Sequence, residues 1–171
     1  TPYSGNPGNF ATANGIVYFA ASGGNETHEI WKTDGTVAGT TLIKDIYSGI
    51  QGYALTNFIT LSGNLYFTVY GGASGNELWK SDGTEAGTVR VKDLWLGSNS
   101  SSPRYLTDVG GTLYFIANDG TSGRELWKSD GTEAGTLLVN DITPGVADST
   151  LEDFTNVNGT LYFTSENSAG V

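Results

Sequence analysis

Carboxylate side chains recur at two fixed places in this 171-residue chain. One stands before a Gly-Thr pair, in Asp34, Asp82 and Asp130. The other precedes an apolar residue and a tryptophan, in Glu29, Glu77 and Glu125. A pair of carboxylates can supply the acid and base of a glycosidase, and acidic oxygens in turns are the ligands that calcium prefers. Glycoside hydrolysis and calcium binding are therefore the two chemistries to weigh.

The spacing of these carboxylates argues against both chemistries. Each set repeats every 48 residues, so its members have equivalent surroundings, whereas a catalytic acid and base need environments that separate their pKa values. One aspartate per loop is too few for calcium, and the alternating Asp/Asn pattern of an EF-hand is absent. The sequence favours an aspartate that caps its own turn. It predicts no enzyme, no metal site and no cofactor, with bound calcium as the alternative.

Composition excludes several other functions. The chain has no cysteine, and its one histidine, His28, aligns with Asn76 and Arg124. A catalytic triad or a thiolate metal site is therefore not expected. The net charge of −10 disfavours nucleic acid as a partner, because phosphate binding needs clustered cations. No apolar run approaches the roughly 18 residues of a membrane span.

The carboxylates belong to a longer repeat. The twelve residues ELWKSDGTEAGT occur at Glu77–Thr88 and Glu125–Thr136, and a variant occurs at Glu29–Thr40. A period of 20–50 residues indicates solenoids, propellers or arrays. The period of 48 divides the chain into an inter-blade loop at 1–9, full units at 10–57, 58–105 and 106–153, and a partial unit at 154–171.

Each full unit predicts four short strands. Two-residue pairs such as Asn14-Gly15 indicate a type I′ hairpin turn after the first strand, and Leu-Tyr-Phe forms a second strand buried on both faces. Glu-Leu-Trp-Lys forms the third strand, and residues such as Thr136–Ile142 form the fourth. We expect an all-β, β-propeller-like array of four-stranded antiparallel blades, with a linear array of β-meander modules as the alternative. Trp31, Trp79 and Trp127 are expected between neighbouring sheets.

The fourth unit contains only its first two strands, and Thr1–Asn9 resembles an inter-unit loop. Strand edges without partners promote aggregation. We therefore expect the 171 residues to be a segment of a longer repeat chain. Further repeats or a partner protein would then cover Tyr162 and Phe163.

The repeated residues resemble the ELWxxDGT repeat family of secreted and cell-surface bacterial proteins. The second and third copies match its motif as written, and the first differs only by Ile30 in place of leucine. The flanking Gly87-Thr88 and Val91-Lys92-Asp93 also fit, and the resemblance covers essentially the whole chain. It implies a propeller-like module at an extracellular or cell-surface location. It implies no defined activity.

Specificity is expected where the units differ, because loops on a rigid scaffold often carry binding. Three aromatic residues lie in or beside the variable loops between units, namely Tyr53, Trp95 and Tyr105. These residues either contact a sugar or a protein partner, or cover the rim of the scaffold. The predicted function is a non-catalytic structural or interaction scaffold, with a lectin-like glycan-binding module as the alternative.

Overall fold

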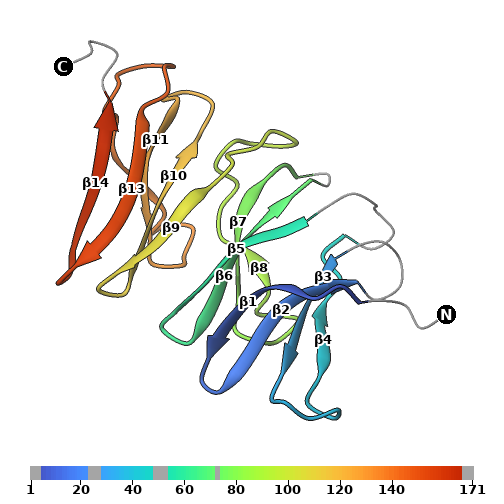
Figure 1. Cartoon of the computed structure of the whole chain (residues 1–171). Helices are drawn as coiled ribbons and strands as arrows, with labels where there is room; N and C mark the ends of the chain where they lie inside the picture. The colour runs from blue at the N-terminus through green and yellow to red at the C-terminus, as the bar shows by residue number, and fades with distance from the viewer. Residues whose placement is uncertain (1–4, 23–27, 48–53, 72–73, 167–171) are drawn as a thin grey trace.

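The described part of the chain is all-β, with fourteen strands and no helix (Figure 1). It is a computed structural model that describes residues 5–22, 28–47, 54–71 and 74–166. The strands form four antiparallel sheets, and the strands of each sheet follow one another in chain order. The predicted fold class is thus confirmed as all-β, and the sheets have the predicted four-strand pattern in the three full units.

The strands of each sheet have the following bounds. Sheet 1 contains β1 (Gly8–Ala13), β2 (Ile16–Ser22), β3 (His28–Thr33) and β4 (Thr41–Lys44). Sheet 2 contains β5 (Ala54–Leu61), β6 (Asn64–Tyr70), β7 (Glu77–Ser81) and β8 (Val89–Arg90). Sheet 3 contains β9 (Arg104–Val109), β10 (Thr112–Asn118), β11 (Arg124–Ser129) and β12 (Leu137–Asn140). Sheet 4 contains β13 (Thr150–Val157) and β14 (Thr160–Glu166).

The turn between the first two strands of each sheet has the predicted chemistry. Both of its residues have positive φ in every sheet, as in Asn14 at 52° and Gly15 at 77°. Two successive positive φ angles define the type I′ turn, which matches the twist of the strands it joins. These turns fix the register in which β2, β6, β10 and β14 begin.

The fourth strand is shorter than predicted. In unit 3 it covers Leu137–Asn140 rather than Thr136–Ile142. The pairing of β11 with β12 shifts register between Leu126 and Trp127, and such an irregularity breaks the regular ladder. The outer edge of each four-stranded sheet is only a few residues long.

Each four-stranded sheet has two apolar faces. The leading face carries the phenylalanine of the second strand and the tryptophan of the third, which are directly opposite each other in register, as in Phe67 and Trp79. The trailing face carries the tyrosine of the second strand and the apolar residue before the tryptophan, as in Tyr66 and Leu78. Since both faces are apolar, a sheet of this kind requires a neighbour on each side.

The sheets pack face to face in chain order, so that sheets 2 and 3 have a neighbour on each side within the described residues. Tyr18 and Ile30 on the trailing face of sheet 1 share one core with Leu65 and Phe67 on the leading face of sheet 2. The trailing face of sheet 2 meets the leading face of sheet 3 in the same way, through a core that includes Tyr66. The second strand is consequently buried on both sides, as predicted, with Leu65 0%, Tyr66 3% and Phe67 0% exposed.

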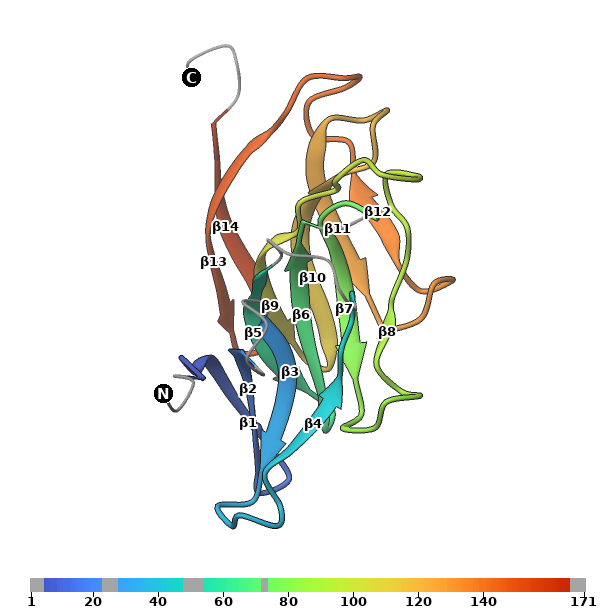
Figure 2. The same ribbon diagram turned by 90° about the vertical axis from the view of Figure 1, so that its right-hand side faces the viewer.

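The first strands of the sheets lie together. β5 contacts both β1 and β9, and β13 contacts β9. The hydroxyl of Thr60 donates to the carbonyl of Thr12 at 2.9 Å, and Asn156 Nδ2 donates to the carbonyl of Asp108 at 2.8 Å, 48 residues apart in each case. Figure 2 shows β1, β5, β9 and β13 along one side of the molecule and β4, β8 and β12 along the other. None of the described sheets closes on itself.

A tyrosine from one sheet lies against a glycine in the turn of the next. A Cβ atom added to Gly131 would lie 2.1 Å from Tyr66 Oη, and one added to Gly83 would lie 2.9 Å from Tyr18 Oη. Lys32 Nζ also donates to the carbonyl of Gly83 at 2.7 Å. The absence of a side chain at Gly83 and Gly131 therefore permits the close approach of neighbouring sheets.

This contact predicts different costs for one substitution at two equivalent turns. Gly131 and Gly35 have φ of 87° and 92°, but no atom of the described residues lies within 4 Å of a Cβ built on Gly35. Gly35→Ala should cost only the backbone strain, about 1 kcal/mol. Gly131→Ala should lose about 1–3 kcal/mol more, because its methyl group displaces Tyr66. Urea unfolding of both variants measures the difference, and equal losses would contradict the proposed packing.

Candidate functional site

The three Asp-Gly-Thr turns share one hydrogen-bond pattern. In unit 2, Asp82 Oδ1 accepts the Thr84 amide at 2.8 Å and the Thr84 hydroxyl at 2.7 Å. The Thr84 hydroxyl oxygen in turn accepts the Gly87 amide at 2.9 Å. The same bonds form around Asp34 and Asp130. Each aspartate caps its own turn, and this structural role accounts for its repetition in the three units.

The aspartate also explains the second glycine of the motif. A Cβ atom on Gly87 would lie 2.1 Å from Asp82 Oδ1, so no larger residue fits there. The Thr84 hydroxyl and amide stabilise the ionised carboxylate and lower the pKa of Asp82. Among the described residues, no three His, Asp or Glu side chains gather as a metal site would need.

The repeated glutamate is buried and holds the connection to the next sheet. Glu77 is 0% exposed. Its Oε2 accepts the Ser101 hydroxyl at 2.5 Å and the Leu94 amide at 3.4 Å, and its Oε1 accepts the Ser101 amide at 2.9 Å. Bonds from donors to a carboxylate are stronger than bonds between neutral groups. The segment between β8 and β9 is thus fastened to β7 at two points.

The same fastening occurs one unit later. Glu125 accepts the Ile142 amide at 2.9 Å and the Ser149 hydroxyl at 2.6 Å. The donors again lie 17 and 24 residues after the glutamate. In unit 1, Glu29 is also buried, but the residue 24 positions later is Tyr53, which lies outside the described residues. The glutamates therefore act as structural acceptors in the two units where their partners are described.

Burial raises the pKa of Glu77, although the bonds from Ser101 and Leu94 oppose this effect. A raised pKa is also typical of a general acid. Glu77 does not line either of the two surface pockets described below. The cause of the shift is the burial of a carboxylate that fastens the connection between β8 and β9.

The three tryptophans occupy corresponding positions but differ in exposure. Trp127 is buried, at 6% exposed, and its indole nitrogen donates to the carbonyl of Ala117 at 3.1 Å. Trp31 makes the equivalent bond to Ala21 at 3.2 Å, yet it is only half-buried and lines a surface pocket of about 230 Å³ on the leading face of sheet 1. Trp79 is half-buried and stacks edge-on against Tyr47. The tryptophans of sheets 2 and 3 lie between sheets, whereas no described sheet covers Trp31.

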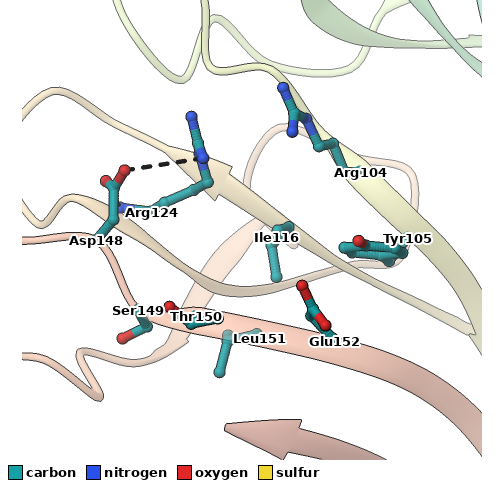
Figure 3. A pocket seen from close by; sticks show the side chains of 9 residues that line it. All are labelled: Arg104, Tyr105, Ile116, Arg124, Asp148, Ser149, Thr150, Leu151 and Glu152. Atoms are coloured by element: carbon teal, nitrogen blue, oxygen red, sulfur yellow. Dashed lines mark hydrogen bonds and ion pairs between the residues drawn. The ribbon is translucent and has the colours of Figure 1, made fainter. Parts of the chain in front are cut away.

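A second pocket of about 240 Å³ lies where sheets 3 and 4 meet (Figure 3). Figure 3 shows Arg104 and Arg124 toward one end of it and Tyr105 and Glu152 toward the other. Asp148 Oδ1 accepts the Arg124 amide at 2.8 Å, and its Oδ2 lies 3.8 Å from the Arg124 guanidinium. Arg124 Nε is buried without a hydrogen-bond partner in the described part of the chain. The pocket thus combines an aromatic ring with charged groups of both signs.

Tyr105 occupies an unusual backbone position in this pocket. Its φ is 55°, at a β-bulge where the other units have Asn9, Asn57 and Asp153 with φ of 54°, 56° and 57°. Asparagine and aspartate tolerate this left-handed conformation, whereas a bulky residue there is an outlier. Tyr105 is 46% exposed, and its ring stacks on Phe154 with the centroids 5.8 Å apart. The strain at Tyr105 makes it the candidate binding residue with the best structural support.

The second aromatic candidate, Trp95, does not line this pocket. Trp95 is half-buried, and a Cβ atom on Gly120 would lie 2.5 Å from its indole nitrogen, so its ring covers the turn before β11. Tyr53 lies outside the described residues. The sequence patterns did not identify the charged residues of this pocket, namely Arg104, Arg124, Asp148 and Glu152. Alignment of the units offers one signal for two of them, because Arg104 replaces Thr56 and Arg124 replaces Asn76.

Comparison with family models finds no match for this chain, and comparison with curated proteins finds none either. No helix in the described residues is long and apolar enough to cross a membrane.

The pKa of Glu77 predicts a pH-dependent effect of Glu77→Gln. Its folded pKa lies above the ordinary value of 4.5, so its contribution to stability is greatest below that pH and is lost as the pH rises through the folded value. The stability of the unsubstituted protein relative to Glu77→Gln should therefore fall as the pH rises from the ordinary value of 4.5 through the raised folded pKa of Glu77. Urea unfolding across this range, with exposed Glu133→Gln as the control, measures it. A constant difference would contradict the assignment.

Proposed function

We propose that this chain is part of a non-catalytic scaffold built of β-propeller blades. The proposal is based on one observation: the repeated polar groups form hydrogen bonds that hold the fold together. Asp82 caps a turn, Glu77 fastens the connection between sheets, and Lys32, Lys44 and Lys92 donate to carbonyls of the following unit. Groups committed to such bonds hold the sheets in place and leave little for catalysis.

The packing of the sheets supports the propeller over a linear array of separate modules. The trailing face of one sheet meets the leading face of the next, with the first strands together on one side. Blades that pack in this way and close into a ring would surround a central channel. The resemblance to the ELWxxDGT repeat family supports an extracellular or cell-surface location in bacteria. Further repeats of the same chain or a protein partner are the proposed binding partners.

Chains of four to eight units, about the range that propellers use, test the arrangement. They can be built by repeating residues 58–105 and 106–153. In solution scattering, the maximum dimension should stop growing at the unit number that closes the ring. A dimension that increases with every added unit would show an open array instead. If the unsubstituted chain has glycosidase activity and a correctly folded Glu125→Gln variant lacks it, the non-catalytic assignment would be overturned.

Glycan binding is a second candidate, favoured by the strained Tyr105. A ring exposed beside guanidinium and carboxylate groups can stack on a sugar while these groups bind its hydroxyls. The stacking of Tyr105 on Phe154 gives it a structural role as well, so the two roles need to be separated.

Tyr105→Asn separates the two roles, because asparagine is the residue that Asn9 and Asn57 supply at the same bulge. The variant should fold, because asparagine relieves the backbone strain. On a glycan array it should lose the binding that the unsubstituted chain shows. Tyr70→Ala, at a residue 63% exposed and outside the pocket, should retain that binding. Equal binding by Tyr105→Asn would exclude this pocket as the glycan site.

A further inference from the structure

The outer edge of β14 faces no strand in the described part of the chain. β14 pairs with β13 only, whereas β2, β6 and β10 each have a third strand on that edge. Tyr162 is 58% exposed, although the corresponding Tyr18 and Tyr66 are 4% and 3% exposed. An edge of this kind presents unpaired backbone groups to which a further strand can add.

The face of sheet 3 is incompletely covered at the same place. The core between sheets 3 and 4 contains three buried residues, against eight and nine in the two preceding cores. Tyr114, which corresponds to Tyr66, is only half-buried. Tyr66 lies against Gly131 in the Asp-Gly-Thr turn of the next sheet, but no such turn follows β14 in the described residues. The uncovered surface therefore extends from β14 onto sheet 3.

We propose that this surface binds a β-hairpin of the chain's own repeat type, with the sequence pattern of β11, the Asp-Gly-Thr turn and β12. The proposal deepens the scaffold function, but it rests only on the packing between neighbouring sheets and holds for a closed ring and an open array alike. The register in which the hairpin pairs with β14 follows from the internal repeats. The hairpin's tryptophan lies opposite Phe163, as Trp79 lies opposite Phe67 and Trp127 opposite Phe115.

The contacts of the bound hairpin follow from the internal copies. The glycine after its aspartate lies against Tyr114 Oη, as Gly131 lies against Tyr66 Oη. Its tryptophan extends the apolar layer that Phe154 and Phe163 already form, with ring centroids 5.5 Å apart. The hairpin thus completes both the sheet of β13 and β14 and the core beneath Tyr114.

The buried glutamate sets the length of the donor segment. Glu125 needs the Ile142 amide and the Ser149 hydroxyl, 17 and 24 residues further along. A hairpin that ends at Asn140 would carry this carboxylate into the interface without those donors, and an unpaired buried charge is costly. The competent donor therefore spans Gly123–Thr150 rather than the two strands alone.

Peptide binding to the complete 171-residue chain tests the proposal. A dye-labelled peptide of residues 123–150 should bind saturably with one-to-one stoichiometry in fluorescence anisotropy. A peptide of residues 123–141 should bind about tenfold more weakly or worse, because its glutamate lacks both donors. A scrambled peptide of the same composition should not bind. Absence of binding by the longer peptide, or equal binding by the scrambled one, would overturn the proposal.

Two variants locate the peptide on this surface. Appending residues 124–153 after Val171 continues the 48-residue period, and the extended chain should no longer bind the peptide, because its own hairpin occupies the edge. A peptide with Gly131→Ala should bind the unsubstituted chain about tenfold more weakly. Part of that loss should be recovered on a Tyr114→Phe chain, in which the hydroxyl is absent. Unchanged binding to the extended chain, or no recovery on Tyr114→Phe, would place the peptide elsewhere and overturn the proposal. A ring that fails to close would leave these results unaffected.

Discussion

The buried glutamate that fastens the connection between sheets is the constraint on which the repeat depends. A carboxylate such as Glu77 is costly to bury unless donors surround it. Its donors, Leu94 and Ser101, belong to the segment that enters the next sheet. The cost of burial is offset only when that segment takes one path, which fixes where β9 begins. The apolar faces then meet in a set position, and Tyr66 reaches Gly131. One polar group thus determines the position at which the next sheet forms.

Much of the fold was predictable because the local signals agree. The period of 48 residues gave the number of units, Asn14-Gly15 and its equivalents gave the type I′ turns, and Leu-Tyr-Phe gave a strand buried on both faces. These features depend on residues close together in the chain, where φ preferences and side-chain alternation act directly. The length of the fourth strand was less predictable, because the register shift at Trp127 depends on how β11 meets β12.

The site was less predictable, because it depends on contacts between units. The repeat identified Glu77 and Asp82 but not their partners, although serine 24 residues after Glu77 and Glu125 was visible in the sequence. Residues at equivalent positions of the repeat also differ in how deeply they are buried. Trp127 is covered by sheet 2, whereas Trp31 has the same sequence context and no described sheet in front of it. The bulge that strains Tyr105 is likewise a property of pairing between β9 and β10.

The packing between sheets is directional, and this property governs how the repeat can assemble. A leading face differs from a trailing face, so each contact is heterologous, and such contacts either close into a ring or continue without limit. Within the described residues, the two ends of the stack present opposite halves of this contact. Phe10 on the leading face of sheet 1 is 61% exposed, and Tyr162 on the trailing face of sheet 4 is 58% exposed. Equivalent hydrogen bonds join the first strands of successive sheets, as Thr60–Thr12 and Asn156–Asp108 illustrate, and such bonds constrain the angle between those sheets. The outcome of assembly therefore depends on that angle and on the number of units, while the variable loops remain available for specificity.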